Sequence, residues 1–137
     1  MRICVDLDGV ICELKPAGAS YADLAPVDGA VRKLRTLKAA GHYIIIFTAR
    51  RMRTHNGNIS RVVADVGKIT LDWLERHDVP YDEILFGKPW ADVYIDDNAL
   101  RFHDWSRIDD SGANLPASRE TAGNANRRSS TDPWSVK

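Results

Sequence analysis

Two aspartates near the N-terminus, Asp6 and Asp8, follow the apolar run 3–5 and precede Gly9. Side chains alternate along a strand, so residues two apart lie on the same face. Two carboxylates at such a short distance repel each other. This repulsion raises the pKa of one of them unless a cation lies between them. The pair therefore predicts a divalent metal or a shared proton at a strand end. The simpler alternative is a turn in which Asp and Gly only end the strand.

Other groups that could bind phosphate or metal come at the ends of later apolar segments. Thr48, Lys88 and the pair Asp96 and Asp97 each follow a short apolar run. Ligands of open α/β sheets bind beyond the carboxyl ends of the strands. Taken singly, each group has an ordinary explanation as a helix cap or a solvated loop residue. Together they predict one site along one edge of a sheet.

Phosphoryl transfer through an aspartyl phosphate needs this set of groups. An ionised carboxylate attacks phosphorus, and a divalent cation offsets the repulsion between the two anions. A hydroxyl and an ammonium group hold the phosphate oxygens, while a second carboxylic acid protonates the leaving oxygen and then deprotonates the attacking water. Magnesium suits the site best, because carboxylates, carbonyls, phosphate and water are hard oxygen ligands.

The elements that position these groups follow from apolar patterning. We expect strands at 2–7, 43–47, 84–86 and 93–95, a helix from an N-cap at Asp28 to Gly41, and a longer helix over 59–77. Strand–helix alternation favours an α/β fold with a parallel sheet and right-handed crossovers. The run 43–47 is typical of a strand covered on both faces, and Cys4 is expected to be buried. The buried side of the longer helix is expected at Val62, Val63, Val66, Ile69, Leu71, Trp73 and Leu74.

Composition restricts the classes of partner. The 137-residue chain has a formal net charge of zero and 44% hydrophobic residues, which is ordinary for one globular domain without nucleic-acid partners. No apolar stretch approaches the ~18 residues of a membrane span. The chain begins directly with a strand, so no signal or transit peptide is expected. Its two cysteines lack the spacing of a zinc site, and a cytoplasmic location is the simplest expectation.

The composition changes after residue 110. Residues 111–137 are rich in Ser, Ala, Asn, Gly and Arg and lack apolar periodicity. Such a segment cannot bury enough apolar area to offset its ordering entropy. We therefore expect a domain at 1–110 and a mobile tail at 111–137. An arm that orders against a neighbouring subunit through Trp134 is the alternative.

The order of these motifs resembles the haloacid dehalogenase (HAD) superfamily of phosphatases over about residues 1–105. The resemblance implies an α/β, Rossmann-like three-layer sandwich with a central parallel sheet. It also implies Asp6 as nucleophile, Asp8 as general acid and base, and Thr48 with Lys88 as phosphate ligands. Mg²⁺ would be held by the Asp6 carboxylate, the Asp8 carbonyl and Asp96, with Asp97 nearby or acting through water. The candidate substrate ligands are Gly9, Thr48, Ala49, Arg50, Arg51 and Lys88.

A narrower resemblance concerns the substrate. Segments 48–52, 55–58 and 86–92 are similar to small phosphatases of bacterial capsule and surface-polysaccharide biosynthesis, which implies a sugar phosphate. The gaps between motifs leave room for a flap and one helix but for no separate cap domain. An uncapped site either accepts a bulky substrate or is closed by a neighbouring subunit. We expect a homo-oligomer in which a neighbouring subunit closes the site. The loop 50–56, with Arg50, Arg51 and Arg53, is expected to contact a second anionic group or sugar hydroxyls, and Arg50 is the residue closest to the site. The alternative is a solvated basic turn.

Other functions share part of this pattern. A phosphotransferase or mutase of the same superfamily would pass the phosphoryl group from Asp6 to another hydroxyl. A phospho-receiver domain uses similar residues, but its acid pair comes first along the chain, and Asp8 would hasten hydrolysis of the phosphoryl group. A catalytically silent binding module on this fold is the third alternative.

Overall fold

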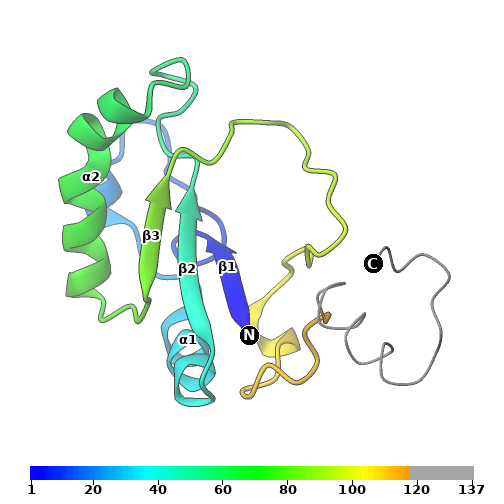
Figure 1. Cartoon of the computed structure of the whole chain (residues 1–137). Helices are drawn as coiled ribbons and strands as arrows, with labels where there is room; N and C mark the ends of the chain where they lie inside the picture. Colours follow the sequence, from blue (N-terminus) through cyan, green and yellow to red (C-terminus); the bar gives the residue numbers. More distant parts are fainter. Residues whose placement is uncertain (118–137) are drawn as a thin grey trace, which may run out of the picture.

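The computed structural model describes residues 1–117. Three parallel strands form one sheet in the order β1-β2-β3 (Figure 1). They are β1 (Arg2–Asp6), β2 (Tyr43–Thr48) and β3 (Glu83–Phe86), with α1 (Ala30–Ala39) and α2 (Ile59–Arg76) in the connections and short 3-10 turns η1 (Tyr21–Asp23) and η2 (Trp105–Arg107). The α/β class and the first three predicted strands are confirmed.

The two helices cover the same face of the sheet. Val5, Ile46 and Ile84 are aligned across the three strands. They share one core cluster with Leu34 of α1 and Trp73 of α2. Right-handed crossovers between strands that are neighbours in sequence order place both helices on one side. Over the described residues the fold therefore has two layers, where three were predicted.

The opposite face of the sheet has no helix over it in the described part of the chain. Cys4 and Leu85 point to this side and are exposed, while Ile45 and Phe47 beside them are half-buried. The predicted burial of Cys4 is wrong for this reason, since alternation along β1 places it opposite Val5. The run 43–47 has one fully covered face and one that is partly open.

The predicted strand 93–95 does not form. Gly87, with φ +100°, turns the chain after β3, and residues 87–104 run as an irregular connection beyond β1 (Figure 1). Val93 and Ile95 are 70% and 97% exposed. A three-residue apolar run between aspartates offers few contacts to offset the entropy of ordering it. Among the described strands, β1 pairs with β2 alone.

The helix ends partly follow the sequence signals. Asn58 caps α2, its side chain accepting a hydrogen bond from the Arg61 amide. The N-cap of α1 is Gly29 at φ +78°, not Asp28, and it makes no side-chain capping bond. This positive φ favours glycine, whereas a Cβ at Gly29 would lie at an ordinary van der Waals distance of 3.4 Å from Trp105 Cβ.

The buried side of α2 is one stripe. Val62, Val66, Trp73 and Leu74 are buried as predicted. The other predicted members are less covered: Ile69 is half-buried, and Val63 and Leu71 are exposed. A helix over a single sheet face buries only the residues on that stripe.

The chain after η2 returns to the core. Trp105 donates from Nε1 to the Val10 carbonyl at 2.7 Å. Lys33, buried on α1, donates to Asp110 at 2.6 Å and to the Ile108 carbonyl. Leu115 packs against the core cluster. The packed region thus extends past the predicted boundary at 110.

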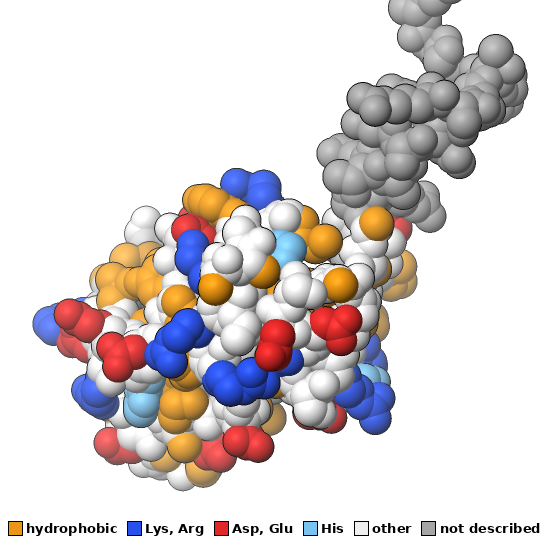
Figure 2. All heavy atoms as spheres, turned by 90° about the horizontal axis from the view of Figure 1, so that it is seen from below, with side chains coloured by type: hydrophobic (Ala, Val, Ile, Leu, Met, Phe, Trp, Pro, Cys, Tyr) orange, Lys and Arg blue, Asp and Glu red, His pale blue; other side chains and the backbone are white. Residues whose placement is uncertain are grey.

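Residues 118–137, with Trp134, lie outside the described residues, so the prediction for most of the tail stays a prediction. Within residues 1–117, no helix combines the length and apolarity that a membrane crossing requires. On the face drawn in Figure 2, acidic and basic side chains are interspersed and not gathered by sign. This distribution agrees with the balanced formal charge.

Candidate active site

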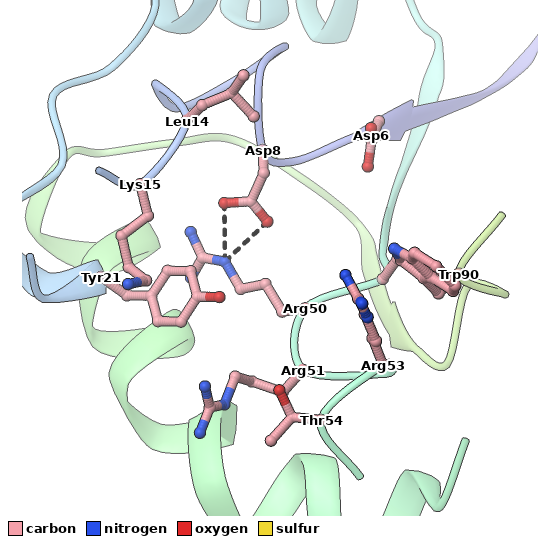
Figure 3. A pocket seen from close by; sticks show the side chains of 11 residues that line it. Asp6, Asp8, Leu14, Lys15, Tyr21, Arg50, Arg51, Arg53, Thr54 and Trp90 are labelled. Atoms are coloured by element: carbon pink, nitrogen blue, oxygen red, sulfur yellow. Dashed lines mark hydrogen bonds and ion pairs between the residues drawn. The ribbon is translucent and has the colours of Figure 1, made fainter. Parts of the chain in front are cut away.

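Asp6 is the last residue of β1 and faces a pocket of about 510 Å³ (Figure 3). Its Oδ1 accepts a hydrogen bond from the Leu7 amide at 2.9 Å, and its Oδ2 lies 3.6 Å from Lys88 Nζ. Burial raises the pKa of Asp6, Lys88 and the Leu7 amide oppose that shift, and the nearby Asp8 adds to it. Asp6 is therefore a partly desolvated carboxylate with an ammonium group beside it.

A tight turn directs Asp8 into the same pocket. The Leu7 carbonyl accepts hydrogen bonds from three successive amides, Val10, Ile11 and Cys12. Gly9 adopts φ +83°, which a side chain would oppose. The strand thus ends at Asp6, and the turn, not a continued pleat, brings the second carboxylate beside the first.

Arg50 lies beneath Asp8, and its side chain has no exposed surface (0%). Nε lies 3.1 and 3.0 Å from the two Asp8 oxygens. The other nitrogens donate to Thr70 Oγ1 at 3.0 Å and to Cys12 Sγ at 3.2 Å, and the guanidinium stacks on Tyr21 at 4.2 Å. Each guanidinium nitrogen of Arg50 thus has a partner within the protein, and the ion pair positions Asp8. Arg50 also lines the pocket, so its direct contact with substrate stays a prediction.

Thr48 and Lys88 join the ends of β2 and β3. Thr48 is fully buried; its Oγ1 accepts from the Arg50 amide at 3.1 Å, and its carbonyl accepts from the Lys88 amide at 3.1 Å. Lys88 Nζ lies 4.7 Å over the Tyr94 ring. Thr48 therefore lies under the site, while Lys88 reaches Asp6 from β3.

The predicted metal ligands are not gathered. Asp96 and Asp97 lie on the exposed connection 87–104 and do not line the pocket. Asp96 accepts a hydrogen bond from the Asn98 amide at 3.1 Å. In residues 1–117, no three His, Cys, Asp or Glu side chains converge as a metal site. The structure brings Asp6 and Asp8 together and leaves Asp96 and Asp97 apart, because the strand that would carry them is not formed.

Of the remaining predicted ligands, Ala49 and Arg51 line the pocket and Gly9 does not. Arg51 donates to Asp65 of α2 at 2.8 Å, and His55 contacts the same oxygen at 2.7 Å. The hydrogen bonds from His55 and Arg51 lower the pKa of Asp65. This contact fixes the loop after β2 against α2.

Six pocket residues were not among the candidate ligands, although two of them belong to the basic loop after Thr48. They are Leu14, Lys15, Tyr21, Arg53, Thr54 and Trp90. Lys15 Nζ lies 5.5 Å over Tyr21, and Arg53 Cζ lies 4.9 Å over Trp90. The available signal was the proximity of these residues in sequence to the aspartate pair, Thr48 and Lys88. Figure 3 shows the two cation–aromatic pairs on opposite sides of the Asp8–Arg50 pair.

These features define an α/β protein with an acid-containing pocket at the carboxyl end of a parallel sheet. A crystal structure of an MCSG target from Vibrio cholerae is 37% identical, covers 79% of this chain and 89% of that chain, and aligns with a TM-score of 0.72. The chain belongs to the same family as this Vibrio cholerae protein.

The other comparisons add no function. A chain of the Pnkp1/Rnl/Hen1 complex is 25% identical, covers 71% of this chain and 30% of that chain, and has a TM-score of 0.45, which is too low to support an argument. No family model matches the sequence. No curated protein matches it.

Proposed function

We propose that the protein is a magnesium-dependent phosphatase of the HAD type that hydrolyses a small phosphorylated metabolite through an aspartyl phosphate. The observation that carries the proposal is Asp6, a partly desolvated carboxylate at a strand end, with Lys88 Nζ at 3.6 Å and Asp8 two residues later. A candidate nucleophile and a candidate acid thus line one pocket, and an ammonium group that could bind phosphate oxygens lies beside the candidate nucleophile. The motif order along the chain is the second support.

In the proposed reaction, an Asp6 oxygen attacks phosphorus and the bond to the ester oxygen breaks. Asp8 in its protonated form gives its proton to that oxygen, and the alcohol leaves. Asp8 then removes a proton from a water molecule, whose oxygen attacks the phosphorus of the aspartyl phosphate and restores Asp6. Lys88 balances charge on the phosphate oxygens during both steps.

The donor chemistry of Asp6 and of the Asp8 carbonyl fits Mg²⁺, which prefers hard oxygen ligands. When bound, the ion would offset the repulsion between carboxylate and phosphate. The set is incomplete without further oxygens, and Asp96 or Asp97 would supply them only if the connection 87–104 approached β1. Metal binding by these two residues is therefore part of the proposal.

Phosphate release from p-nitrophenyl phosphate with added Mg²⁺ tests the proposal. We expect Asp6→Asn to abolish turnover and Asp8→Asn to lower it strongly. Asp96→Asn should weaken activation by Mg²⁺, whereas Asp92→Asn, a matched change on the same exposed connection, should not. Turnover that survives in Asp6→Asn would refute the nucleophile, and equal Mg²⁺ dependence in the Asp96 and Asp92 variants would refute the metal assignment.

The pocket is open, and within the described residues its neighbouring loop segments hold only η1 and turns. We propose, from the same resemblance, that a second subunit closes it over a sugar phosphate. Sizing chromatography combined with light scattering tests this, and a fully active monomer would contradict it.

A further inference from the structure

The pocket carries more positive charge than its own acids balance. Three carboxylates around it are each paired with a base: Asp6 with Lys88 at 3.6 Å, Asp8 with Arg50 at 3.0 Å, and Asp65 with Arg51 at 2.8 Å. Lys15 and Arg53 also line the pocket. Over residues 1–117, neither has a carboxylate within ion-pair distance. Two positive charges are therefore available to a ligand.

Arg53 is placed to bind such a ligand directly. Its guanidinium carbon lies 4.9 Å over the ring of Trp90, which is 55% exposed. A guanidinium stacked on an aromatic face keeps its N–H donors in its own plane, where they can bond an anion. Figure 3 shows Arg53 and Trp90 on the side of the pocket nearer Asp6, with Lys15 beyond Asp8.

The neighbouring arginines are already paired with carboxylates and are less available for this role. Arg50 is buried and bonded to Asp8, and Arg51 is bonded to Asp65 together with His55. Removing either from its partner would leave a carboxylate without its cation. Among residues 1–117, Arg53 has no carboxylate partner to give up.

We propose that Arg53 binds a second anionic group of the substrate, so that the preferred substrates are phosphate esters that also carry a carboxylate or a second phosphate. This inference rests on the proposed phosphatase activity. Trp90 holds the guanidinium in position, and Lys15 adds a favourable field from the other side of the pocket. A neutral sugar phosphate would leave both cations unused.

The test compares substrates that differ by one charge. Glucose 1-phosphate and glucuronic acid 1-phosphate differ only at one carbon, and the initial rate with glucose 1,6-bisphosphate shows whether phosphate replaces carboxylate. We expect the native protein to have the higher kcat/KM for the charged substrates. Arg53→Gln should reduce that preference about tenfold, the scale of one charge-assisted hydrogen bond. Arg61→Gln, which removes an exposed cation of α2 outside the pocket, should leave the preference unchanged.

Binding measured by calorimetry separates this inference from the proposed activity. In the Asp6→Asn background, glucuronic acid 1-phosphate should bind more tightly than glucose 1-phosphate, and adding Arg53→Gln should remove the difference. If p-nitrophenyl phosphate is hydrolysed but the preference is absent or insensitive to Arg53→Gln, the second anion site is wrong and the phosphatase stands. If no ester is hydrolysed, the phosphatase proposal fails, and an unchanged binding ratio then rejects the Arg53 site independently.

Discussion

Arg50 Nε lies 3.1 and 3.0 Å from the two carboxylate oxygens of Asp8, and the whole Arg50 side chain is buried. The remaining guanidinium nitrogens are held by Thr70 and Cys12. A guanidinium held by Asp8, Thr70, Cys12 and the Tyr21 ring cannot move with a substrate. It can, however, hold the Asp8 carboxylate in one orientation. The orientation of Asp8 thus depends on α2 and on the turn after β1.

We expect Arg50→Met to lower the free energy of unfolding by about 3 kcal/mol, because it leaves the partly buried Asp8 without its cation. It should also lower kcat about 100-fold through misplacement of Asp8. Urea unfolding and p-nitrophenyl phosphate hydrolysis measure the two effects. Arg51→Gln, which breaks an exposed pair with Asp65, should lower the free energy of unfolding much less. If Arg50→Met lowers the free energy of unfolding by the same amount in an Asp8→Asn background, the lost ion pair with Asp8 is not the cause.

The raised pKa of Asp6 predicts that this residue makes the stability of the fold depend on pH. Burial raises the pKa of Asp6, so the folded state binds the proton more tightly than the unfolded state. The carboxyl therefore favours folding at low pH, and this contribution is lost as pH rises through the folded pKa. Asp6→Asn removes the cost of burying the ionised form, so it should raise Tm at pH 7. The gain should shrink below about pH 4, where the carboxyl is protonated in both states.

Asp82 is a matched control, because its pKa is shifted in the opposite direction from that of Asp6. The Lys38 ammonium and the Ile44 amide hold the pKa of this carboxyl below its usual range. Its stabilisation is present above the unfolded pKa and is lost as pH falls through the folded pKa. Asp82→Asn should therefore lower Tm at pH 7, with a smaller loss in acid. Thermal melts from pH 3 to pH 7 that moved both variants in the same direction would contradict this account of Asp6.

The sequence located the two pocket carboxylates, Asp6 and Asp8, because both depend on local order: an apolar run, two acids and a glycine. It did not reveal the role of Arg50, whose partners Thr70 and Cys12 lie 20 and 38 residues away. The burial of Cys4 was predicted wrongly because the strand pattern does not say which face the helices cover. The strand at 93–95 failed because its apolar residues indicate strand propensity, whereas pairing with β1 depends on the path of the chain after Gly87.

The two cysteines should react differently with alkylating reagents. Burial, with the Asp8 carboxylate adding to it, raises the pKa of Cys12 to about 12. Its thiolate fraction at pH 8 is then roughly one in ten thousand, and the thiolate is the reacting form. Cys4 is exposed on the uncovered face. Iodoacetamide should modify Cys4 in the folded protein and Cys12 only in urea, as mass mapping of peptides would reveal. Equal labelling rates in the native state would place Cys12 outside the packed site.

Gly87 joins β3 to Lys88 and has two reasons to be glycine. Its φ is +100°, and a Cβ there would lie 2.7 Å from Cδ1 of Ile59 at the start of α2. Gly18, at φ +79°, has open space around the same position. Gly18→Ala should therefore cost only the backbone strain, about 1 kcal/mol. Gly87→Ala should cost more, because either the Ile59 side chain or the backbone before Lys88 must shift. A backbone shift would also lower kcat by moving Lys88 away from Asp6.

The difference between the two glycine variants isolates the contact with Ile59. In an Ile59→Ala background the contacting atoms are absent. The loss of unfolding free energy caused by Gly87→Ala should then equal that caused by Gly18→Ala, and part of kcat should return. The native protein, the Gly87→Ala and Ile59→Ala variants and the double variant are compared. Chemical unfolding gives the free energy of unfolding of each, and steady-state kinetics gives kcat. If the excess cost of Gly87→Ala persists without the Ile59 side chain, the strain lies in the backbone alone. The position of Lys88 would then be set by the turn and not by the packing of α2 against it.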